Sequence, residues 1–92
     1  MQRSAAILSA MSNTKRLEVL IALLGREYHV TELAERVRLS QSALSQHLAK
    51  LRTAQLVSTR RDAQTIFYSV KSPVVRAVLD ALAVSVEPSK IA

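Results

Sequence analysis

The chain has 92 residues, which suffice for one small domain and leave no room for a second hydrophobic core. The absence of cysteine excludes disulfides, thiolate zinc sites and thiol redox switches, and the net charge of +6 favours an anionic partner such as nucleic acid or a lipid surface. No apolar run approaches the roughly 20 residues of a membrane span and no segment resembles a signal peptide, so we expect a cytoplasmic protein.

The N-terminal part of the chain predicts two helices. Residues 4–11 are small and apolar, which is consistent with a short helix. Asn13 is a good N-cap for the next helix, whose apolar residues recur at helical spacing: Leu17, Leu20, Ile21 and Leu24. Gly25 supplies a stop signal. The charged residues are expected to lie off this apolar stripe: Lys15, Arg16 and Glu18.

Residues 31–53 predict two further helices joined by a tight turn. Thr31 is expected to cap the first, and Ser40 begins the second after a turn at residues 38–40. The first helix turns three residues inward: Leu33, Ala34 and Val37. The second carries a stripe of leucines within about 60° of one another: Leu44, Leu48 and Leu51. A short helix, a tight turn and a second helix form the helix-turn-helix arrangement.

The side of the second helix opposite its leucines is polar and predicts a surface that reads bases. Recognition helices contact bases mainly with their N-terminal residues, and Gln pairs bidentately with adenine whereas Ser is less selective. We therefore assign base reading to four residues: Gln41, Ser42, Ser45 and Gln46. Small side chains on this face let the helix approach the groove floor. The alternative, an ordinary solvated helix face, stays open on composition alone.

Positive charge is concentrated between residues 36 and 61, a stretch with no acidic residue and with six cations. Past Leu56 the pattern becomes extended, and two β-branched segments separated by residues 62–64 predict a hairpin over residues 56–70. Such a hairpin after a helix-turn-helix is a wing. We assign contacts with the DNA backbone to the helix and the wing together: His47, Lys50, Arg52, Arg60, Arg61 and Gln64. Helix packing is the alternative for His47, and an exposed edge protected by charge is the alternative for the wing arginines.

The C-terminal helix is expected over residues 73–86, between the cap at Ser72 and the break at Pro88. It is apolar on most sides and therefore needs a second buried surface, which another copy of the chain can supply. Residues 1–12 and 73–86 are thus expected to be dimerisation helices. The predicted fold is mainly α with a small β-hairpin: one winged helix-turn-helix domain over residues 1–92, in the order ααααββα, that forms a homodimer.

Four motifs in order resemble the ArsR/SmtB family of bacterial winged-helix repressors: NTKRLEVL (13–20), TELA (31–34), SQSALSQHL (40–48) and LVSTRR (56–61). The resemblance covers nearly the whole chain, and residues 40–68 look most like the nodulation regulators of that family. It implies a homodimer that is held by the first and last helices and binds a roughly palindromic DNA operator.

The chain departs from the metal-sensing members of that family. Those members place two cysteines at the start of the first helix of the helix-turn-helix, where this chain has His29 and Thr31. Members that bind zinc on the last helix use Asp and His pairs, whereas this helix has Asp80 and no His. Zinc needs three or four protein ligands, so we expect no metal and no cofactor. We interpret His29 as a solvated loop residue.

The preferred function is a sequence-specific, double-stranded DNA-binding repressor. The alternative is a winged-helix module that binds protein and not DNA, against which the unbroken basic stretch argues. An enzyme is not expected, because the chain has no cysteine and no Gly-rich phosphate loop, and its two histidines have no carboxylate at a suggestive spacing.

Overall fold

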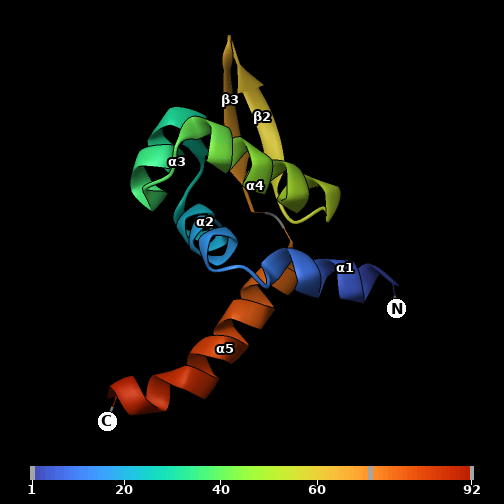
Figure 1. Ribbon diagram of the computed structural model, residues 1–92, viewed down its shortest axis with the longest axis vertical. Helices are drawn as coiled ribbons and strands as arrows, with labels where there is room; N and C mark the ends of the chain where they lie inside the picture. The colour runs from blue at the N-terminus through green and yellow to red at the C-terminus, as the bar shows by residue number, and fades with distance from the viewer. Residues whose placement is uncertain (1, 71, 92) are drawn as a thin grey trace.

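The computed structural model describes residues 2–70 and 72–91, with side chains described over residues 4–70 and 72–82. The elements follow in the order α1 (Gln2–Met11), α2 (Thr14–Gly25), β1 (Tyr28–His29), α3 (Val30–Val37), α4 (Gln41–Thr53), β2 (Ser58–Asp62), β3 (Thr65–Ser69) and α5 (Pro73–Ile91). Figure 1 shows β2 and β3 projecting beyond α3 and α4 at one end, while α5 extends in the opposite direction.

The core is built from the apolar faces of α2, α3 and α4. The inward residues predicted for α3 and α4 are all buried, which confirms the helix-turn-helix: Leu33, Ala34, Val37, Leu44, Leu48 and Leu51. Leu56 closes the core after α4, and Val75 contributes from α5. Because most of these side chains are thin aliphatics, the helices have to pack closely to exclude water.

The stripe predicted for α2 is partly wrong. Ile21 is 56% exposed, whereas Val19, Ala22 and Leu23 are buried. The reason is that α2 packs against α1, α3, α4 and α5, so its buried surface is wider than one stripe and turned away from Ile21. Arg16, which was expected off the stripe, is half-buried.

The helix caps agree with the sequence at three of four places, and one of them is Ser72, whose Oγ accepts from the Val74 N–H at 3.2 Å. Asn13 Oδ1 accepts from the Arg16 N–H at 3.0 Å, and Ser40 Oγ accepts from the Ala43 N–H at 3.1 Å. The cap of α3 is His29 and not Thr31, since His29 Nδ1 accepts from the Glu32 N–H at 3.4 Å. His29 is therefore not a solvated loop residue.

The wing has a third strand that the order ααααββα omits. The antiparallel sheet runs β1-β3-β2, with Tyr28 opposite Tyr68 and His29 opposite Phe67. A strand of two residues has no period to detect, and only its pairing with β3 defines it. Because α3 begins directly after β1, the sheet ties the start of the helix-turn-helix to the wing.

The last helix is longer than predicted and leaves apolar surface exposed. It continues past Pro88 to Ile91, since a proline removes one backbone hydrogen bond and does not always end a helix. Leu8 on α1 is 58% exposed, and Val74 and Leu82 on α5 are 41% and 44% exposed. None of the described helices is long and apolar enough to cross a membrane.

The tight turns form without glycine. Arg38, Gln55 and Ala63 have φ values of 60°, 62° and 58°, in the left-handed region. The first two follow α3 and α4 in Schellman-type ends, where the N–H groups of Leu39 and Leu56 each donate over 2.9 Å to a carbonyl five residues earlier. Ala63 lies in the two-residue loop between the paired ends of β2 and β3.

Hydrogen bonds of Arg16 join three helices, α1, α2 and α4. Arg16 on α2 donates from Nε to the Ala10 carbonyl of α1 at 2.6 Å, and its Nη1 lies 3.3 Å from His47 Nδ1 on α4. Burial, and then the charges of Arg16 and Lys50, lower the pKa of His47 from its ordinary value of 6.5. His47 is therefore neutral at pH 7 and accepts through Nδ1.

We expect Ala63→Gly to stabilise the protein by about 0.5–1 kcal/mol, because the left-handed region costs a non-glycine residue about 1–2 kcal/mol and the freer unfolded chain offsets part of that gain. Thermal unfolding at fixed protein concentration measures this as a rise in Tm. The matched control is Ala49→Gly on the exposed face of α4, which should destabilise by about 0.5–1 kcal/mol. A fall in Tm for both variants would contradict the strain at Ala63.

We also expect His47 to make stability depend on pH. Because its folded pKa lies below 6.5, the unfolded chain binds the extra proton first, and stability that is present above pH 6.5 is lost as pH falls through the folded pKa. Tm measured at constant ionic strength between about pH 7.5 and 5 should fall more steeply for the wild type than for His47→Gln. Parallel curves would contradict this role.

Candidate nucleic-acid interface

One face of α4 is exposed along its whole length. The four residues assigned to base reading are all exposed, on the surface left free by the buried leucines: Gln41, Ser42, Ser45 and Gln46. Ala49 continues the same face towards the C-terminal half of the helix. The structure therefore brings the four candidates onto one element, and the small Ser and Ala side chains leave the backbone of α4 close to any groove that it enters.

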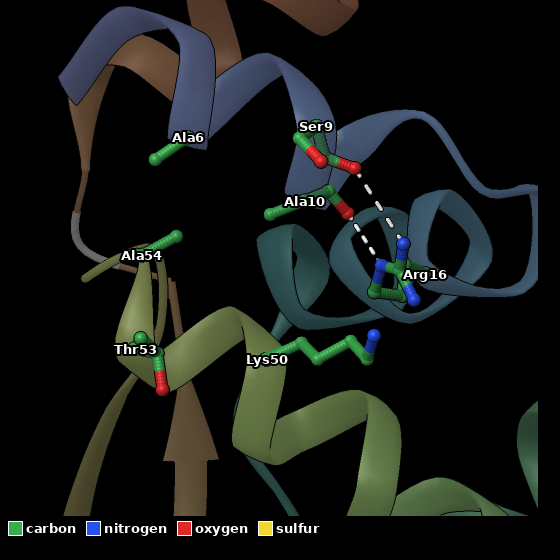
Figure 2. Close-up of a pocket in the computed structure, with 7 residues that line it drawn as sticks. All are labelled: Ala6, Ser9, Ala10, Arg16, Lys50, Thr53 and Ala54. Atoms are coloured by element: carbon green, nitrogen blue, oxygen red, sulfur yellow. Dashed lines mark hydrogen bonds between the residues drawn. The ribbon is translucent and has the colours of Figure 1, made fainter. Parts of the chain in front are cut away.

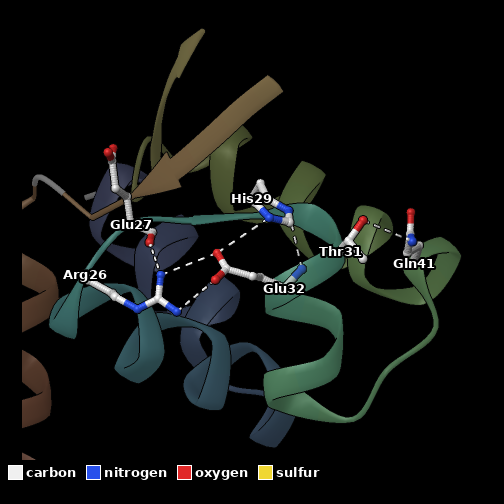
Figure 3. A network of polar contacts seen from close by, with 6 residues as sticks. All are labelled: Arg26, Glu27, His29, Thr31, Glu32 and Gln41. Atoms are coloured by element: carbon white, nitrogen blue, oxygen red, sulfur yellow. Dashed lines mark hydrogen bonds and ion pairs between the residues drawn. The ribbon is translucent and has the colours of Figure 1, made fainter. Parts of the chain in front are cut away.

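The N-terminal end of α4 is fixed from two directions. The Ser40 cap and the Leu39 turn hold it from the α3 side. Gln41 Nε2 donates to Thr31 Oγ1 at 3.4 Å, so the first turns of α3 and α4 lie beside each other (Figure 3). Both first turns carry the partial positive charge of a helix N-terminus, which favours a phosphate nearby.

A polar network anchors the start of α3 behind this end (Figure 3). Arg26 donates from Nη2 to Glu32 Oε2 at 3.0 Å and lies 3.8 Å from the centroid of the Tyr28 ring. Hydrogen bonding to Arg26 lowers the pKa of Glu32, so this carboxylate stays ionised. Sequence reasoning did not identify this network. The only local sign of it is Glu32, since an acidic residue in the first turn stabilises a helix N-terminus.

The two wing arginines have different surroundings. Arg60 donates from Nε to Glu27 Oε1 at 2.9 Å, and its guanidinium lies 4.6 Å from the centroid of the Phe67 ring. Arg61 projects from the opposite face of β2, and its Nε donates to the Ala63 carbonyl at 3.1 Å. Glu27 therefore offsets the charge of Arg60, whereas Arg61 has no ion pair among the described side chains. Gln64 is exposed at the hairpin loop beside Arg61.

The last two turns of α4 add two exposed cations, Lys50 and Arg52, on different sides of the helix. Within residues 4–70 and 72–82 neither forms an ion pair. They flank the polar face and are free to meet an anion. His47, also assigned to the backbone, is half-buried and contacts Arg16. Across the described side chains, no three of His, Cys, Asp and Glu gather in a group that could hold a metal ion.

The match to known sequences covers most of the chain. The family model for bacterial regulatory proteins of the arsR family matches residues 13–59. The nodulation protein NolR of Rhizobium meliloti is 60% identical over 79 residues, which are 86% of this chain and 65% of NolR. The transcriptional activator HlyU of Vibrio cholerae is 50% identical over 80 residues, 87% of this chain and 74% of HlyU. The chain thus spans slightly less than two thirds of the length of NolR.

Solved structures give the same result. NolR from Sinorhizobium fredii superposes with a TM-score of 0.90 at 55% identity, over 92% of this chain and 85% of that one. The transcriptional repressor BigR from Xylella fastidiosa superposes with a TM-score of 0.84 at 30% identity, over 92% and 87% of the two chains. The chain belongs to the arsR family of bacterial regulatory proteins, the winged helix-turn-helix regulators of transcription that bind DNA.

Proposed function

We propose that this chain binds double-stranded DNA as a homodimer and represses transcription by occupying a roughly palindromic operator. The observation that carries the proposal is the exposed polar face of α4, opposite its buried leucines. In the proposed complex this face enters the major groove, where Gln46 and Gln41 select bases by hydrogen bonds to base edges and Ser42 and Ser45 add less selective contacts. A bacterial regulator of this kind acts in the cytoplasm, where the chromosome lies.

In this proposal, phosphate contacts surround the exposed polar face of α4 that reads the bases, which we call the reading face. Lys50 and Arg52 flank it on α4, and Arg61 and Gln64 reach the backbone from the wing. Arg61 is the stronger wing contact, because Glu27 offsets the charge of Arg60. His47 on α4 and Arg60 on β2 support the contacts that these two elements make with the DNA backbone. Phosphate contacts fix the position of the protein, and base contacts set its sequence preference.

The apolar surface of α1 and α5 supports the proposed homodimer. Leu8, Val74 and Leu82 are large apolar side chains exposed on these two helices. A second copy related by a two-fold axis covers them on both chains at once. Figure 1 shows α5 directed away from α4 and the wing, so pairing through α5 leaves the reading face free. Two α4 helices about 34–36 Å apart then meet successive major grooves, which requires a palindromic site.

Relatives of both regulatory kinds are known, since HlyU is an activator and BigR a repressor. We propose repression for this chain because occupancy of a promoter is sufficient to block it. Activation would need a further contact with the transcription machinery. In vitro transcription from a promoter that contains the selected operator tests this directly, and an increase of transcript on adding the protein would overturn repression.

Salt is expected to weaken DNA binding steeply. If the dimer neutralises about 6–10 phosphates, the logarithm of its affinity for a cognate duplex falls against the logarithm of salt concentration with a slope of about −5 to −9. Fluorescence anisotropy between about 50 and 200 mM KCl measures the slope. A flat dependence on a duplex selected from genomic DNA would exclude this mode of binding.

Substitutions at Gln46 and Lys50 should separate base reading from backbone contact. Gln46→Ala should lose about 1–3 kcal/mol of discrimination at one base pair in each half-site and leave binding to other sequences unchanged. Lys50→Gln is the contrasting variant: it should weaken binding to all sequences and reduce the magnitude of the salt slope by about 1 for each chain of the dimer. Uniform weakening by Gln46→Ala would place Gln46 on the backbone instead.

A further inference from the structure

A cavity of about 330 Å³ lies between α1 and the C-terminal end of α4 (Figure 2). Small side chains keep it open: Ala6, Ser9 and Ala10 line it from α1, and Ala54 lines it just after α4. Its volume is at the lower end of the range of about 300–1,000 Å³ that is typical of small-molecule sites. None of the residues assigned to base reading or to the wing lines this cavity, so it can bind a ligand of its own.

Two cations from different helices reach the cavity. Arg16 comes from α2 and Lys50 from α4, and Figure 2 shows the Lys50 side chain extended towards the Arg16 guanidinium. The hydrogen-bond partners of Arg16 across α1 and α4 are carbonyls and a neutral imidazole. No carboxylate among the described side chains pairs with either cation. Two like charges that share a site repel each other, and an anion between them relieves both.

The electrostatics of a neighbouring residue agree with this geometry. His47 contacts Arg16 and lies within electrostatic range of Lys50. Its pKa is lowered first by burial and then by the charges of Arg16 and Lys50. The local potential is therefore positive enough to disfavour a third positive charge, which is the condition that favours a negative one.

The proposed dimer surface leaves this cavity accessible. On α1, Ala6 and Ala10 are each two residues from Leu8, so they lie about 160° around the helix from it. A second copy that covers Leu8 therefore approaches from the far side of α1. Lys50, Thr53 and Ala54 line the cavity from the C-terminal end of α4, and Lys50 also flanks the polar face of that helix.

We propose that the cavity between α1 and α4 binds a small anion with a carboxylate or phosphate group, held by Arg16 and Lys50, and that this anion weakens DNA binding. The second half rests on the proposed function, because it requires that Lys50 contact the DNA backbone. A bound anion neutralises Lys50 and occupies it, so the ligand and the operator compete for one cation. The chain would then carry an effector site that needs neither cysteine nor metal.

The test begins without DNA. Inorganic phosphate and citrate are titrated into the ¹⁵N-labelled full chain at constant ionic strength, with chloride as the reference salt. We expect saturable shifts of the Arg16 side-chain Nε–H and of backbone amides in residues 6–10 and 50–54 for at least one of the two probes. Lys50→Gln should weaken that binding about tenfold, the loss expected for one charge-assisted hydrogen bond.

Two further variants separate a built site from general attraction. Ala6→Leu fills the cavity and keeps both cations, and since Ala6 is exposed the chain should still fold; it should abolish the shifts. Arg36→Gln removes an equal charge from α3, outside this cavity, and should leave them unchanged. The proposal is overturned if neither probe gives a saturable shift, if Ala6→Leu binds like the wild type, or if Arg36→Gln weakens binding as much as Lys50→Gln does.

The second arm uses a DNA duplex. At constant ionic strength the saturating anion should raise the Kd of the wild type for DNA by about fivefold or more and leave that of Ala6→Leu unchanged. An unchanged wild-type Kd overturns the regulatory half. Shifts at the cavity with the duplex, and none with free anions, would assign the cavity to the DNA backbone and overturn the effector site. If the protein binds no DNA at all, the proposed function fails, while the first titration still decides the cavity.

Discussion

The burial of Leu44, Leu48 and Leu51 is the interaction on which the rest of the structure depends. These leucines fix the rotation of α4 about its axis, so the polar side chains between them face outward without further support. A polar residue turned into the core would cost several kcal/mol without a hydrogen-bond partner, which makes any other rotation of α4 unfavourable. The capped turn at residues 38–40 then fixes where the helix begins. The direction of the polar face of α4 is thus a consequence of core packing.

A core of thin aliphatics explains other features of the chain. Among the described residues Tyr28 is the one buried aromatic, so each helix contributes little apolar area and the ends of helices have to contribute as well. Leu39 and Leu56 do so: each follows a left-handed residue and folds back against the core through a Schellman-type bond. The exposed apolar side chains of α1 and α5 follow from the same scarcity, because one chain has no more core in which to bury them.

The sequence was sufficient for several features that a local pattern sets. Caps at Asn13 and Ser40, the leucine period of α4 and the change to an extended pattern after Leu56 all lie within a few residues of what they control. It was insufficient for β1, which exists through its pairing with β3, and for Ile21, whose exposure depends on four neighbouring helices. Arg16 contacts His47, which is 31 residues away in the sequence, and Arg60 pairs with Glu27, which is 33 residues away. No local pattern predicts contacts at these separations.

The contacts of Arg16 and Arg60 show that the net positive charge is not all available to a partner. In the sequence the basic residues look alike, and together they suggest one positive surface. The fold gives them different roles, since Arg26 and Arg60 are offset by carboxylates, Arg16 joins three helices, and Lys50, Arg52 and Arg61 keep their charge available. An anionic partner therefore meets fewer cations than the net charge implies, at defined positions. Because one of them, Lys50, lies between the polar face of α4 and the cavity, the proposed operator and the proposed anion would compete for the same charge.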